Sequence, residues 1–176
     1  MEKTRILSLD PGTVNFGWGC LEYYRKRTTV VRCGMLPGLV KDLVKPLEVD
    51  VDIYTKGIRR LIRNSKATVL VSERYSTRIR GTTGEAVNMM IGIAVREFLN
   101  MRPEGTVQVF MPMTWKASIK KHLGHEIPPF YKMCGIKAHP VDACLVGTYW
   151  TVKMQGGKWP NVNTFAKQIN GGFIEL

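Results

Sequence analysis

The chain has 176 residues, of which 44% are hydrophobic, so it is long enough and apolar enough to fold around a core. Its 26 Lys and Arg residues outnumber its 14 Asp and Glu residues, which gives a formal net charge of +12. This composition excludes a disordered chain, and no apolar run approaches the length that crosses a membrane. The charge favours a polyanionic partner, most often a nucleic acid, over a role in solubility alone.

The N-terminal part of the chain predicts three strands in succession. The first covers residues 4–9, and two runs rich in aromatic and β-branched side chains cover residues 16–23 and 28–35. The four residues Tyr24-Arg25-Lys26-Arg27 suit a charged hairpin loop between the second and third strands. Short connections between three strands indicate an antiparallel meander.

The rest of the chain predicts alternating helices and strands. A helix over residues 47–64 precedes an almost wholly apolar strand over residues 67–73, as expected for a central strand covered on both faces. The later expected elements are a helix from the capping box Thr82-x-x-Glu85 to about Met101, a strand over 106–110, a helix over 114–123, an irregular stretch over 124–138, a helix from Pro140 to about Met154 and a tail that wraps the surface. This order predicts one α/β domain over residues 1–176, in which a mixed five-stranded sheet of three antiparallel strands followed by parallel βαβ units is flanked by helices.

Two of the predicted strands end in a carboxylate. Asp10 ends the first strand and Glu73 ends the fourth. If these strands are neighbours, the two acids lie close together, which is unfavourable unless a cation lies between them. Carboxylate oxygens suit Mg²⁺ or Mn²⁺. Taken alone, an aspartate such as Asp10 before Pro11 and Gly12 is more often a turn residue than a metal ligand.

The run His-Pro-Val-Asp-Ala at residues 139–143 adds an imidazole and a third carboxylate. With proline at the first helical position, His139 falls near the N-cap and Asp142 in the first turn, on the same face of the helix. Small Gly147 lets this helix approach the sheet closely. Together with Asp10 and Glu73, these residues suffice for two divalent metal ions about 4 Å apart that hold a phosphodiester for in-line attack by water.

The sequence resembles the RuvC-like Holliday junction resolvases at three motifs. Leu7-Ser8-Leu9-Asp10-Pro11-Gly12-Thr13, with Asn15 and Gly17 after it, resembles the opening motif of that family, Val69-Leu70-Val71-Ser72-Glu73 the second acidic motif, and His139-x-x-Asp142-Ala143 the third. The resemblance covers about residues 4–150 in the same order. It implies a ribonuclease H-like fold, a homodimer, and a divalent-metal endonuclease of DNA recombination and repair that nicks opposed strands of a four-way junction symmetrically.

The resemblance also implies roles for particular residues. Asp10, Glu73, His139 and Asp142 would be the catalytic residues that bind the two metal ions. Tyr75 occupies the position of an aromatic ring that reaches the junction core, although a packing role is the alternative. The basic residues expected on the DNA are Arg74, Arg78, Arg80, Lys116, Lys120 and Lys121. Between Lys116 and His139 the chain is shorter and richer in proline and aromatic residues than the family pattern, so the contacts of this segment stay open.

The cysteines and the N-terminus indicate a compartment. Cys20, Cys33, Cys134 and Cys144 lack metal-knuckle spacing, which indicates reduced, mostly buried thiols in a reducing environment. The first residues lead straight into a strand, so no signal peptide is expected. With the resemblance, this predicts the cytoplasm of a bacterial cell or a phage-infected host cell, and no membrane partner.

Three other functions share some of these features. A ribonuclease that cuts RNA–DNA hybrids, or a transposase or integrase core, would carry similar acids on the same fold. A non-catalytic basic nucleic-acid-binding module is disfavoured by the intact set of acids. An actin-like ATPase also begins with an Asp and Gly motif after a strand, but that architecture needs two such domains and a much longer chain.

Overall fold

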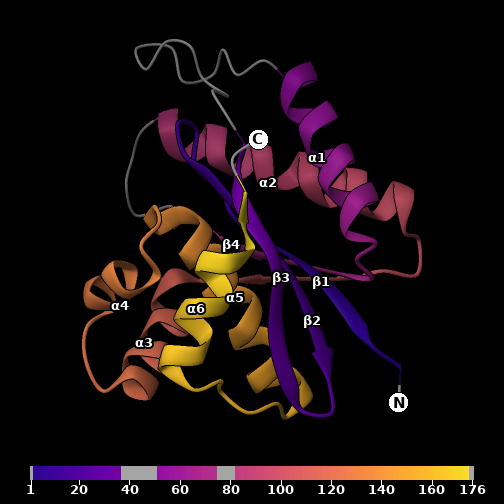
Figure 1. Ribbon diagram of the computed structural model, residues 1–176. Coiled ribbons are helices and arrows are strands. Elements are labelled where there is room, and N and C mark those ends of the chain that lie inside the picture. Colours follow the sequence, from indigo (N-terminus) through magenta and orange to yellow (C-terminus); the bar gives the residue numbers. More distant parts are fainter. Residues whose placement is uncertain (1, 37–50, 75–81, 175–176) are drawn as a thin grey trace.

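The computed structural model describes residues 2–36, 51–74 and 82–174 (Figure 1). In this part of the chain a six-stranded sheet has the strand order β5-β4-β1-β2-β3-β6. The first three strands form the expected antiparallel meander: β1 (Thr4–Asp10), β2 (Phe16–Tyr24) and β3 (Arg27–Leu36). Two further strands extend the sheet in parallel: β4 (Val69–Glu73) pairs with β1, and β5 (Thr106–Phe110) pairs with β4. The predicted mixed sheet flanked by helices is confirmed.

Helices cover both faces of the sheet (Figure 1). One face packs against α1 (Val51–Ser65) and α2 (Thr82–Met101). The other packs against α3 (Pro112–Leu123), α4 (Ile127–Cys134), α5 (Ala138–Gln155) and α6 (Val162–Gly172). Side chains of β1 alternate between the two layers: Ile6 belongs to the core under α5, whereas Leu7 and Leu9 belong to the core under α1 and α2. Burial on both faces explains the almost continuous apolar character of β1 and β4.

Helix α5 lies unusually close to the sheet. It is buried from Pro140 to Thr151. A Cβ atom added at Gly147 would lie 2.8 Å from the Ser8 side chain, so a glycine is needed for this approach. A Cβ atom added at Gly17 of β2 would lie 2.2 Å from the His139 carbonyl oxygen. The expectation that Gly147 allows close packing is confirmed, and the first turn of α5 rests directly on the backbone of β2.

The stretch 124–138 contains a helix, so the expectation of irregular structure there was wrong. Helix α4 starts after Glu126, with Pro128 and Pro129 in its first turn. A proline in the first turn lacks only an N–H group that has no intrahelical partner, so two adjacent prolines are compatible with a helix start. Helix α5 begins at Ala138, two residues before Pro140, so the expectations that Pro140 is its first residue and that Asp142 lies in its first turn were wrong.

The tail after Gln155 is also more ordered than the sequence predicts. It contains α6, whose N-cap residue Asn161 accepts hydrogen bonds from the N–H groups of Asn163 and Thr164 at 3.1 and 3.2 Å. It ends in β6 (Phe173–Ile174), which pairs in parallel with β3 and adds a sixth strand to the five expected. The expected helix residues 47–50 and the Thr82 side chain of the capping box lie outside what the structure describes.

Two expectations from composition also find their outcome in the structure. All four cysteines are free and buried, as the sequence predicts. Within the described ranges, no helix has both the length and the apolar character needed to cross a membrane.

Candidate active site

Asp10 and Glu73 lie at the ends of adjacent parallel strands. Leu9 of β1 is opposite Ser72 of β4, so the next residue of each strand is one of the two acids. Parallel strands bring their carboxyl ends to the same edge of a sheet, where ligands of open α/β sheets commonly bind. The sequence-based expectation that these two strands are neighbours is therefore confirmed.

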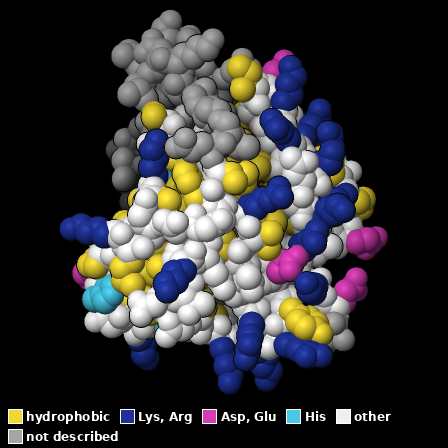
Figure 2. Space-filling view, viewed as in Figure 1, with side chains coloured by type: hydrophobic (Ala, Val, Ile, Leu, Met, Phe, Trp, Pro, Cys, Tyr) yellow, Lys and Arg dark blue, Asp and Glu magenta, His cyan; other side chains and the backbone are white. Residues whose placement is uncertain are grey.

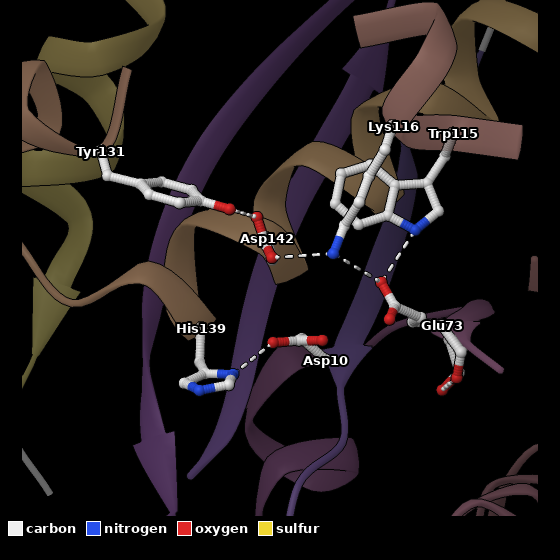
Figure 3. Close-up of polar contacts among 8 residues, drawn as sticks. Asp10, Glu73, Trp115, Lys116, Tyr131, His139 and Asp142 are labelled. Atoms are coloured by element: carbon white, nitrogen blue, oxygen red, sulfur yellow. Dashed lines mark hydrogen bonds and ion pairs between the residues drawn. The ribbon is translucent and has the colours of Figure 1, made fainter. Parts of the chain in front are cut away.

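The N-terminal end of α5 brings His139 and Asp142 to the same edge (Figure 3). Asp10 pairs with Gly17 in the ladder between β1 and β2, and Gly17 packs against the His139 backbone. This packing places His139 Nδ1 2.6 Å from Asp10 Oδ2. Asp10 and Asp142 are buried, whereas 41% of the His139 side chain is exposed. The imidazole thus connects a buried carboxylate with water.

Lys116 of α3 extends its ammonium group between two of the acids (Figure 3). Its Nζ lies 3.9 Å from Glu73 Oε2 and 3.6 Å from Asp142 Oδ2. These separations are longer than those of strong hydrogen bonds, so Lys116 supplies positive charge to both carboxylates without fixing either one.

Two aromatic residues that the sequence did not single out donate hydrogen bonds to the acids. Trp115 Nε1 donates to Glu73 Oε2 at 2.9 Å, and the Tyr131 hydroxyl donates to Asp142 Oδ1 at 2.6 Å. Both donors are neutral, so they orient the carboxylates and leave the negative charge in place. For Trp115 the available signal was its position directly before Lys116. For Tyr131 it was the proline pair that starts α4.

The site is short of positive charge. Burial, followed by the charges of Asp10 and Asp142, raises the pKa of Glu73 to about 7, although Lys116 and Trp115 oppose this shift. Burial and then Asp10 raise the pKa of Asp142 to about 6. The hydrogen bond to Asp10 is the main cause that raises the pKa of His139 above its usual value. Carboxylates with raised pKa values are stabilised by a bound proton or by a bound cation.

The side chains of the site are suitable in kind, but not in their present positions, as ligands of a divalent metal ion. As placed, no three His, Cys, Asp or Glu side chains among the described residues converge closely enough to hold one. The chemistry of the donor set nevertheless fits, because three carboxylates share one lysine and one histidine. Within the described structure, Asp10 Oδ1 and Glu73 Oε1 accept no hydrogen bond. The fit requires that the Lys116 ammonium leave its place between Glu73 and Asp142.

The structure places the residues expected to contact DNA in different surroundings. Arg74 directly follows β4 and is exposed, while its backbone N–H donates to the Phe110 carbonyl at 2.8 Å. Lys120 and Lys121 are exposed on α3, and Lys120 pairs with Glu126. Tyr75, Arg78 and Arg80 lie outside the described residues. Of the expected DNA-contacting residues that are described, Lys116 is the one that interacts with the acids.

The structure of this protein is similar to known structures, whereas its sequence matches no protein in the comparisons. No protein-family model and no curated protein matches the sequence. A structure of Thermus thermophilus RuvC in complex with a Holliday junction substrate aligns with a TM-score of 0.65 and 14% identity, over 88% of this chain and 97% of that chain. The yeast mitochondrial Holliday junction resolvase Ydc2 aligns with a TM-score of 0.58 and 12% identity, over 96% of this chain and 84% of that chain.

A third similar structure belongs to a different kind of nuclease. The human cytomegalovirus terminase nuclease domain aligns with a TM-score of 0.52 and 12% identity, over 86% of this chain and 85% of that chain. A manganese-soaked structure of the same domain aligns with a TM-score of 0.50. These alignments confirm the ribonuclease H-like fold that the sequence predicts. At such identities the fold is what is shared, so the activity has to be argued from the site.

Proposed function

We propose that this protein is a structure-selective endonuclease that resolves four-way DNA junctions by paired symmetric nicks. One observation carries the proposal: Asp10, Glu73 and Asp142 meet at one edge of a sheet whose fold is shared with RuvC and Ydc2. The charge of +12 supports a nucleic acid as the substrate. Because a junction is cut at two opposed strands, two copies of the chain would supply the two sites.

The carboxylates of Asp10, Glu73 and Asp142 would hold two divalent metal ions, Mg²⁺ or Mn²⁺. When bound, such ions lower the pKa of a coordinated water and stabilise the charge on the scissile phosphate. The manganese-soaked terminase nuclease domain, which shares this fold, supports the choice of metal. Trp115 and Tyr131 keep the Glu73 and Asp142 carboxylates oriented.

His139 and Lys116 have separate tasks in this proposal. His139, at 2.6 Å from Asp10 and partly exposed, either positions the attacking water or serves as a further metal ligand. Lys116 would turn its ammonium group from the carboxylates to the phosphate next to the cut, where it adds positive charge. Both tasks use groups that already lie beside the acids.

A cleavage assay tests the proposal. The substrates are an end-labelled four-way junction, a linear duplex and an RNA–DNA hybrid, each with and without Mg²⁺ or Mn²⁺. We expect paired symmetric nicks on the junction alone and only with metal. Asp10→Asn should abolish the nicks and keep junction binding, because binding rests on lysine and arginine side chains. Asp52→Asn, which changes an exposed acid on α1, is the matched control.

The other outcomes identify other functions. Cleavage of the hybrid would indicate a ribonuclease. Cleavage of the linear duplex without preference for the junction would indicate a nuclease closer to the terminase domain or a transposase core. Absence of cleavage on every substrate would indicate a non-catalytic nucleic-acid-binding module on a nuclease fold.

A further inference from the structure

The turn between β2 and β3 has a backbone conformation that its two residues rarely adopt. Tyr24 pairs with Arg27, so Arg25 and Lys26 alone form the turn. Both have positive φ angles, 49° and 63°. A two-residue hairpin turn with two positive φ angles is of type I′, which strongly prefers Asn-Gly because the Cβ of other residues is crowded there. The chain thus has two long cationic side chains where the backbone favours Asn-Gly.

These two residues belong to a cluster of exposed cations, the hairpin-tip surface, which consists of Arg25, Lys26, Arg27 and Lys158. The loop after α5 joins the cluster because the Lys158 N–H donates to the Lys26 carbonyl at 2.9 Å. Within the described ranges, none of the four forms an ion pair with a carboxylate. Figure 2 shows lysine and arginine side chains gathered at the end of the molecule where this hairpin turns.

Neighbouring contacts hold the hairpin-tip surface in place. The Tyr23 hydroxyl donates to the Gln155 carbonyl at 2.9 Å, and the Thr28 and Thr151 hydroxyls lie 2.6 Å apart. These contacts fasten the hairpin to the end of α5. The closest acid of the same hairpin, Glu22, is already paired with Lys3 and Arg5. The hairpin that carries the cations is therefore held in place, and within the described structure no carboxylate pairs with them.

The hairpin-tip surface lies far from the candidate active site. In the ladder between β1 and β2, Thr4 pairs with Tyr23 at one end and Asp10 pairs with Gly17 at the other. The strand between Thr4 and Asp10 spans about 20 Å at roughly 3.3 Å per residue. That distance equals about six base pairs of duplex at 3.4 Å each. A contact at the hairpin tip would therefore involve phosphates well away from the cut.

We propose that the hairpin-tip surface binds the phosphate backbone of a duplex arm of the substrate, outside the region that is cut. This inference rests on the proposed function, because it takes branched DNA as the substrate. The surface has no helix or strand that could enter a groove and contact base edges. Its arginine and lysine side chains would therefore contact phosphates independently of the base sequence. The surface would thus add affinity for long arms and leave the choice of the cutting position unchanged.

The double variant Arg25→Asn with Lys26→Gly tests this proposal without a loss of folding. It gives the turn its favoured dipeptide, so the thermal unfolding midpoint should stay the same or rise. Binding is measured by fluorescence anisotropy without divalent metal, on junctions with arms of about 15 base pairs and on junctions with arms of about 4 base pairs closed by hairpin loops. On long arms we expect a loss of affinity of roughly tenfold or more, and a salt slope reduced by about 1.8. On short arms we expect no change.

A control variant with the same loss of charge distinguishes the loss of a local contact from the effect of a lower net charge on DNA binding. Lys56→Gln with Lys167→Gln removes two exposed cations from α1 and α6. An equal loss in this control, an equal loss on short arms, or no loss on long arms would overturn the proposal. Binding of the wild type to anionic lipid vesicles that the turn variant abolishes, with DNA binding intact, would assign the surface to a membrane instead. If one of these results is obtained and the wild type still cleaves the junction normally, this inference alone is refuted. The proposed function then stands.

Discussion

Tyr131 of α4 donates a hydrogen bond of 2.6 Å to Asp142 near the start of α5. The bond uses Oδ1 of the carboxylate, while Oδ2 faces the Lys116 ammonium at 3.6 Å. Trp115 also donates to its carboxylate, but it uses Glu73 Oε2, the same oxygen that faces Lys116 at 3.9 Å. Each of these two acids thus has one neutral aromatic donor that fixes its orientation and preserves its charge. Such supporting donors commonly decide how well a carboxylate binds a metal ion.

The first prediction concerns Tyr131→Phe. The variant keeps the ring and removes the donor, so Asp142 loses its fixed orientation. We expect cleavage of the junction to fall by about 10- to 100-fold and to need more Mg²⁺, with junction binding unchanged. Tyr54→Phe is the matched control, since it removes a 2.6 Å hydrogen bond to the Met90 carbonyl between α1 and α2, on the other face of the sheet. A wild-type rate for Tyr131→Phe throughout a Mg²⁺ titration would contradict the assignment.

The second prediction concerns Trp115→Phe. The hydrogen bond from Trp115 lowers the pKa of Glu73, so its loss should raise that pKa further. We expect the midpoint of the pH–rate profile to move to higher pH, with a lower maximum rate. Trp18→Phe is the control, because Trp18 Nε1 is buried and has no hydrogen-bond partner in the described structure. Equal pH profiles for the two variants would show that the indole contributes bulk alone.

The third prediction is a dependence of stability on pH and metal. Glu73, with a pKa of about 7, and Asp142, with one of about 6, retain protons in the folded state that the unfolded chain has released. From about pH 4 to pH 7, the free energy of unfolding of the metal-free protein therefore falls as pH rises, for Glu73 by on the order of 3 kcal/mol. The raised pKa of His139 acts in the same direction, because its contribution is lost as pH rises through that value.

Thermal unfolding with and without Mg²⁺ checks this prediction. Because the metal replaces protons, Mg²⁺ should raise the unfolding temperature more at about pH 8 than at about pH 5. Acids elsewhere in the chain add their own pH dependence, so the useful quantity is the difference between the wild type and Glu73→Gln. That variant should have a smaller loss of stability between these pH values. An unchanged pH dependence in Glu73→Gln would contradict the raised pKa.

The fourth prediction compares two helical glycines. In Gly147→Ala the new methyl group would lie 2.8 Å from the Ser8 side chain and push α5 from the sheet. We expect a loss of about 1–3 kcal/mol in the free energy of unfolding, together with reduced cleavage because His139 and Asp142 move with the helix. At Gly92 of α2 an added Cβ meets no described atom within 4 Å. Gly92→Ala should therefore raise stability by about 0.5–1 kcal/mol in urea unfolding.

The amino-acid sequence was enough to predict the elements with strong local signals and the acids attached to them. Runs of apolar and β-branched residues define β1 and β4, and each run ends in its carboxylate. The spacing of His139 and Asp142 places both near the start of one helix, although Asp142 lies just past the first turn. Local signals were ambiguous where prolines and glycines gather, which is why α4 and α6 were missed. A proline pair starts a helix or breaks one, and the choice depends on what the following residues pack against.

The contacts between particular residues became known from the packed fold. Trp115 and Glu73, and likewise Lys158 and Lys26, are distant in the chain, and Tyr131 and Asp142 belong to different helices. Hydrophobic periodicity tells which side of an element is buried, but not which other element covers it. The partner is chosen by packing of the whole core, as in the contact of Gly17 with the His139 backbone. The acids were therefore readable from the sequence, whereas the donors that orient them emerged only from the packed fold.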